Sequence, residues 1–130
     1  MSFQKNLLDA LAANASLKES IRSLASPPVS AKITESLAYI QAYGNICMSH
    51  PYFYELSKLD SFCFIYTQGG AGLLKINSRS YTMKHGTIAF VDCNQWHRVE
   101  AEQTPWIYKV FFISGPPVAF FYNSLVEESG

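Results

Sequence analysis

This 130-residue chain has three histidines, the side chains best suited to metal binding or acid-base catalysis. His50 precedes a proline and His85 precedes a glycine, so both are expected in turns. His97 alone falls in a predicted strand, where alternation with the polar Arg98 and Glu100 directs its ring inward. Because a metal site needs about three protein ligands, one inward histidine is not enough, and we predict neither a metal nor a cofactor.

Aromatic side chains are the second group that could do chemistry, and the chain has nine Phe, eight Tyr and two Trp. Rings can stack on a sugar or an aromatic metabolite while hydroxyl and imidazole groups fix its orientation. The other interpretation is that these rings simply fill a small barrel. The predicted ligand-binding residues are His97, Trp96, Tyr66, Tyr81, Trp106 and Tyr108. No arrangement for nucleophilic catalysis is present in the local sequence, and we predict no catalytic residue.

Short apolar runs separated by tight turns must position these side chains. Glycine and asparagine tolerate the positive backbone angles of such turns. Strands with turn signals every eight to twelve residues are typical of a sandwich or barrel. We therefore predict a barrel of about eight strands over residues 33–113. The predicted turns lie at 69–72, 77–79, 84–86 and 92–95.

Alternation also assigns the two faces of individual strands. Lys75 and Lys109 require water, so their neighbours at odd spacing should point into the barrel. The predicted inward residues are Leu74, Ile76, His97, Val99, Ala101, Trp106, Tyr108, Val110 and Phe112.

Helices are predicted at both ends of the chain. Residues 2–13 have helical spacing, and a capping box at 16–19 starts a second helix that includes Ile21 and Leu24. This helical arm either packs on the outside of the barrel or has a functional role. In the second case it would close over a ligand or contact a second subunit. The first strand is predicted at 33–43, ended by Gly44, with a short strand at 46–48. Residues 116–127 should form a C-terminal helix that begins with proline.

The composition describes one domain of ordinary size, with 48 % hydrophobic and only 15 % charged residues. The formal net charge is zero and no basic stripe is visible, so the chain should not bind nucleic acid by itself. Its three cysteines are expected to be small core residues of a cytoplasmic protein. No apolar run is long enough to span a membrane.

An ordered series of motifs resembles a known family. Gly70-x-Gly72, Asn77-x-Arg79, Gly86-Thr87 and then His97 are similar to the small-barrel cupin pattern. The specific resemblance, over residues 36–127, is to the N-terminal effector-binding domain of the arabinose-regulator (AraC/XylS) family of transcription regulators. It implies a mostly β, cupin-type double-stranded β-helix (jelly-roll) barrel.

The resemblance also implies a function. It predicts a small-molecule effector, a sugar or other small metabolite, and a homodimer. DNA would be bound only through a C-terminal helix-turn-helix domain that is not in this chain. This suggests a truncated regulator, and the alternative is a stand-alone sensor. The predicted division is a helical arm at 1–30, the barrel at 31–115 and the start of a helical region at 116–130.

The chain departs from the family in places that bear on its chemistry. Metal-binding cupins carry a histidine pair where this sequence has Phe62 and Phe64. The turn before His97 lacks the usual prolines, and residues 54–58 lack an arginine often found there, so we expect different effector contacts. A binding module is therefore predicted, with no enzymatic activity. The alternatives are a small metal-free sugar isomerase or epimerase using His97 and a tyrosine as acid and base, and a structural cupin without ligand.

Overall fold

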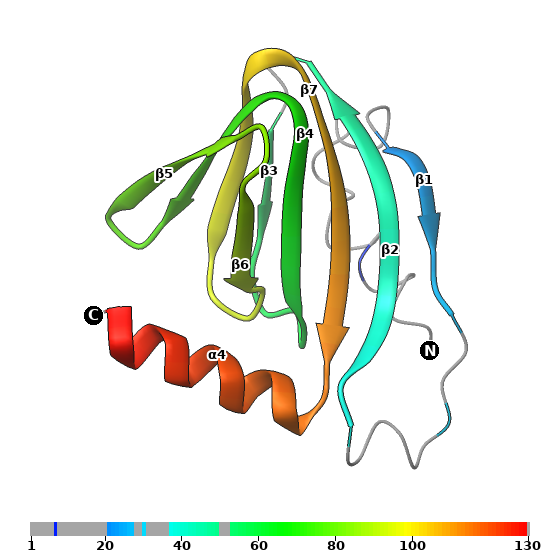
Figure 1. Cartoon of the computed structure of the whole chain (residues 1–130), viewed down its shortest axis with the longest axis vertical. Coiled ribbons are helices and arrows are strands. Elements are labelled where there is room, and N and C mark those ends of the chain that lie inside the picture. Colours follow the sequence, from blue (N-terminus) through cyan, green and yellow to red (C-terminus); the bar gives the residue numbers. More distant parts are fainter. Residues whose placement is uncertain (1–6, 8–20, 28–29, 31–36, 50–52, 130) are drawn as a thin grey trace.

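Seven strands and one helix make up the described part of the chain, which comprises residues 7, 21–27, 30, 37–49 and 53–129 of a computed structural model. Figure 1 shows one strongly curved antiparallel sheet in the order β1-β2-β7-β4-β5, with β3 added to β7 and β6 added to β4. The mostly β fold with a C-terminal helix is confirmed. The elements are β1 (Ile21–Ala25), β2 (Tyr39–Met48), β3 (Phe53–Leu56), β4 (Phe62–Ile76), β5 (Arg79–Lys84), β6 (Ile88–Asp92), β7 (His97–Ser114) and α4 (Pro116–Ser129).

Two long bent strands, β4 and β7, hold the sheet together. They pair along nearly their whole length, from Phe62 opposite Ile113 to Ile76 opposite His97. The register shifts between Thr67 and Gly72, where the chain bends. As a result, the first half of β4 pairs with β6 and the second half pairs with β5, so one strand contributes to two parts of the barrel.

The core lies on the concave face of this sheet, and the strand alternation of the sequence identifies it. All but one of the predicted inward residues are buried, and the exception, Ile76, is partly buried. β2 contributes Ala42, Ile46 and Met48 to the same face. Period-two alternation therefore predicted the core correctly, because one face of the sheet excludes water and the other does not.

Two of the three cysteines lie in this core as free thiols. Cys63 and Cys93 are both fully buried, whereas Cys47 is partly exposed. The adjacent Cys63 thiol and burial both raise the pKa of Cys93, so this thiol is protonated and unreactive. The prediction that these cysteines are small apolar core residues is confirmed for the two.

The predicted second helix is wrong at its C-terminal end, because Ile21–Ala25 is strand β1. A helix of this length is marginal in isolation, whereas the edge of β2 offers ready backbone partners. Leu24 packs against the core, and Asn45 Nδ2 donates to Ser23 Oγ over 2.9 Å. Of the first predicted helix, 2–13, only Leu7 is described, and it is helical and buried; the rest of it and the capping box lie outside the described residues.

Two predicted strand breaks are not breaks. β2 runs unbroken through Gly44, and β4 runs through the glycines at 69–72. Gly44 is needed for close approach, because a Cβ there would collide with the backbone carbonyl of Ser23 in β1. Glycine in these strands marks contact or bending instead of an end. Six described strands, β2 to β7, therefore cover the range that was predicted to hold about eight.

Candidate functional site

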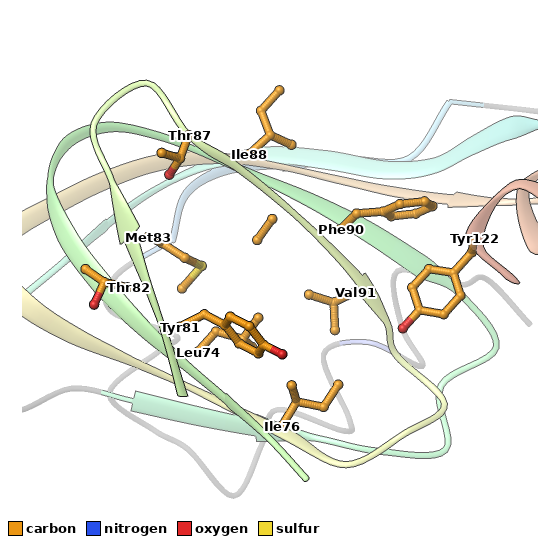
Figure 2. A pocket seen from close by; sticks show the side chains of 11 residues that line it. Leu74, Ile76, Tyr81, Thr82, Met83, Thr87, Ile88, Phe90, Val91 and Tyr122 are labelled. Carbon is orange, nitrogen blue, oxygen red and sulfur yellow. The ribbon is translucent and has the colours of Figure 1, made fainter. Parts of the chain in front are cut away.

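A pocket of about 370 Å³ opens between β5, β6, the end of β4 and α4. Its volume lies in the range of small-molecule sites, about 300–1,000 Å³. Figure 2 shows the side chains that surround it. The lining residues are Leu74, Ile76, Tyr81, Thr82, Met83, Thr87, Ile88, Ala89, Phe90, Val91 and Tyr122.

The pairing pattern of the sheet explains why a pocket exists here. β5 and β6 both pair with β4, but at different halves of it, and neither pairs with the other within the described residues. The bend of β4 therefore separates their free edges. At such an edge every second residue directs its backbone N–H and C=O away from the ladder, so polar backbone groups accompany the side chains at this opening.

The pocket wall is aliphatic at its base and aromatic on the side of α4. Leu74 and Val91 are buried, and Ile88 is 64 % exposed at the rim. The polar atoms of the lining side chains are hydroxyls, apart from the Met83 thioether. One of them, Thr87 Oγ1, already donates to the carbonyl of Lys84 over 2.6 Å.

Aromatic contacts dock α4 beside this pocket. The Tyr122 ring lies 5.0 Å from the Phe62 ring and 5.1 Å from the Phe90 ring, the second contact being edge-on. Phe90 also stacks on Phe64, with 4.4 Å between the ring centroids. In the first turn of α4, the side chain of Val118 is buried. Burial, chiefly, and the nearby Asp92 raise the pKa of Tyr122, so its hydroxyl keeps its proton and can donate.

The predicted site residues separate into three groups. Tyr81 lines the pocket. His97, Trp106 and Tyr108 point inward as predicted and are fully buried in the core. The remaining two lie elsewhere: Tyr66 is half-buried in β4, and Trp96 is 47 % exposed in the turn before β7. Their contact with a ligand stays a prediction, and only Tyr81 is found at the pocket.

Trp106 and Tyr108 fill the interior that a ligand would otherwise occupy. Their rings stack at 4.1 Å, and Trp106 Nε1 donates to Thr67 Oγ1 over 3.1 Å. Gly72 has no side chain where the indole lies, and a Cβ there would collide with that ring. A small barrel packed in this way leaves little central space.

His97 has one satisfied and one unsatisfied nitrogen. Its Nδ1 lies 3.1 Å from the carbonyl oxygen of Gln95, which fixes the proton on Nδ1 in the neutral ring. Its Nε2 is buried without a hydrogen-bond partner among the described residues. Burial is the main cause that lowers the pKa of His97, while the Gln95 carbonyl and Asp92 oppose the shift. The imidazole therefore stays neutral beside the edge of the Tyr54 ring.

Three important pocket residues were missed at the sequence level. Ile88 and Phe90 belong to an apolar strand to which the sequence assigned no binding role, and in the structure they alternate with the inward Ala89 and Val91. Tyr122 lies in the predicted C-terminal helix at 116–127, to which no binding role was assigned. Its hydroxyl group, on an otherwise apolar ring, was the available indication of a binding role.

Neither a metal cluster nor a membrane-spanning helix is found in the part of the chain that the structure describes. No group of three or more His, Cys, Asp or Glu side chains gathers there as metal ligands would. No helix there is long and apolar enough to cross a bilayer.

The curved antiparallel sheet with a pocket at its open side defines a cupin-type ligand-binding barrel. The sequence profile of the AraC-like ligand binding domain matches residues 48–122, more than half of the chain, so the chain belongs to this family. The comparison with curated proteins gives no match.

Two solved structures of similar fold are those of transcriptional regulators. The Cupin_2 domain of an XRE family transcriptional regulator from Enterobacter cloacae is 10 % identical with a TM-score of 0.52, covering 73 % of this chain and 99 % of that one. An HTH_3 family transcriptional regulator from Vibrio cholerae is 13 % identical with a TM-score of 0.53, covering 86 % of this chain and 59 % of that one. These likenesses, at low identity, establish the fold.

Proposed function

We propose that this chain is the effector-sensing module of an AraC-type transcription regulator, and that a small molecule binds between β5, β6 and α4. Membership of a ligand-binding domain family supports the class of function. The pocket supports the place, because its size suits a small metabolite and the barrel centre is filled by Trp106 and Tyr108.

One observation carries the sensing role: the same two rings line the pocket and dock α4. Phe90 and Tyr122 contact each other at 5.1 Å and both face the pocket. A ligand that touches both changes the free energy of helix docking, and by linkage the docked helix changes the ligand's affinity. Ligand binding in the pocket would thus change how α4, the last described element of the chain, packs on the sheet.

An enzymatic role is less well supported. General acid-base catalysis needs a group of suitable pKa within hydrogen-bond reach of the substrate. The lining contains no His, Asp, Glu, Lys or Cys, and His97, the acid or base of the isomerase alternative, is not part of it. We therefore favour binding without turnover.

The regulator proposal includes partners beyond the effector. A homodimer would follow from the family, and DNA would be contacted by helix-turn-helix units outside this chain. The fold shared with two regulators supports this setting. Analytical ultracentrifugation of the chain should show a dimer whose dissociation depends on concentration; a monomer at all concentrations would oppose that part.

A thermal-shift screen of small metabolites tests the site. Hits on the wild type should be lost in Ala89→Trp, because the small side chain of Ala89 lies on the inward face of β6 and lines the pocket. They should persist in the control Ser80→Trp, whose position is exposed on β5 and does not line the pocket. Hits that survive Ala89→Trp would place the site elsewhere.

A further inference from the structure

The pocket lining has no charged side chain. Its eleven residues are aliphatic, aromatic, hydroxyl-bearing or, in Met83, a thioether, and none is a carboxylate, an amine, a guanidinium or an imidazole. A charged ligand group that enters loses hydration and meets no counter-charge in the wall. The lining therefore discriminates by charge as well as by shape.

Two tyrosines on opposite walls supply the directional polar contacts. Tyr81 comes from β5 and Tyr122 from α4, and Figure 2 shows their hydroxyl oxygens turned toward the same space. A neutral phenol both donates and accepts a hydrogen bond. A hydroxyl, carbonyl or amide of a ligand can satisfy either partner, while its ring lies against Phe90 and the aliphatic base.

The charged neighbours of the pocket do not alter this balance. Asp92, beside Tyr122, already accepts from the Asn94 backbone N–H at 3.0 Å and from Gln95 Nε2 at 3.4 Å. Arg79 shares a face of β5 with Tyr81, but it is exposed at the hairpin turn and does not line the pocket.

We propose that the pocket selects an uncharged, ring-bearing molecule with one or two hydrogen-bonding groups, held between the hydroxyls of Tyr81 and Tyr122. This inference rests on the proposed ligand site. It goes further by naming the chemical class of effector and the two residues that read it.

Three probes of one shape and different charge test the class: benzamide, benzoate and benzamidinium. Their binding is followed by backbone amide shifts of the whole chain in two-dimensional NMR at neutral pH. Benzamide should shift residues of β5, β6 and α4, with an affinity at least about tenfold above that of either ion. Ile76→Arg, which adds a cation to the wall at the partly buried end of β4, should raise the affinity for benzoate and not for benzamide.

Hydroxyl deletions test the two reading residues. Tyr81→Phe and Tyr122→Phe keep the rings and should each weaken benzamide by about threefold to tenfold, the usual value of one hydrogen bond. Tyr43→Phe is the matched control, because Tyr43 is as exposed as Tyr81, at 44 % and 45 %, and lies on β2. It should leave the affinity unchanged.

The outcomes separate this inference from the proposed site. Equal binding of benzoate and benzamide with shifts at β5, β6 and α4 would overturn the charge selection and keep the site. Shifts confined to other elements, or none with any probe, would overturn both. Loss of affinity in Tyr43→Phe as large as in Tyr81→Phe would overturn the role of the two hydroxyls.

Discussion

The barrel core and the pocket between β5, β6 and α4 are built from the same kinds of residue and differ in how strands close around them. In the core, Trp106 and Tyr108 stack at 4.1 Å with no exposed surface. At the pocket, Phe90 and Tyr122 stand beside about 370 Å³ of open space. The first region is enclosed by paired strands, and the second lies where β5 and β6 diverge. The open pocket is therefore found at unpaired strand edges and not at the Trp106–Tyr108 stack.

The largest expected difference in the free energy of unfolding is between alanine variants of the two tryptophans. Trp106→Ala removes a fully buried ring and its hydrogen bond, and should lower the free energy of unfolding by about 3–5 kcal/mol. Trp96→Ala removes a ring that is 47 % exposed and should cost less than about 1 kcal/mol. Chemical denaturation measures both. Equal losses would mean that the interior is not the tightly packed region described above.

A smaller effect is expected where the helix meets the pocket. Tyr122→Ala should loosen α4 and lower the free energy of unfolding by about 1–3 kcal/mol, with faster amide exchange in the helix. Phe120→Ala on the opposite side of α4 is the control, since Phe120 is 76 % exposed and should change little. If both variants lose the same stability, the aromatic dock does not hold the helix.

The smallest expected effect is a pH dependence of stability that arises from His97 in the core. Burial lowers the pKa of His97, so below about pH 6.5 the unfolded chain binds this proton more readily than the folded one. Stability should then fall as the pH drops below that value, by at most about 1.4 kcal/mol per pH unit.

His97→Phe should remove this slope in denaturation series at several pH values, and His85→Gln in an exposed turn should keep it. An unchanged slope in His97→Phe would assign the effect to other groups.

The sequence predicted the core better than it predicted the strand ends. Period-two alternation found the inward residues of β7 because burial on one face leaves a clear pattern. Gly44 was predicted to end a strand. In the structure a glycine is needed there because β1 passes too close for a Cβ, and this cannot be seen in the sequence of one strand alone. Ile21–Ala25 looked helical for the same reason, because its stability comes from pairing with β2.

The site was harder to predict than the fold. Tyr81 was identified, but Phe90 and Tyr122 come together only when α4 folds back across the sheet. His97 and Trp106 were predicted as ligand-binding residues because of their residue types. Residue type does not distinguish a ring that fills a core from one that lines a pocket. That distinction depends on which strand edges stay unpaired.

The most direct test of the account compares two methionine methyl groups. Met83 lines the pocket and Met48 is fully buried in the core, so methyl-labelled methionine reports on both regions in one spectrum. On titration with benzamide, the account predicts a saturable chemical-shift change of the Met83 methyl signal and no change of the Met48 methyl signal. The Met83 change should be lost in Ala89→Trp, which fills the pocket from β6. A saturable shift of Met48 with Met83 unmoved would show that ligands enter the barrel core and would contradict the central claim.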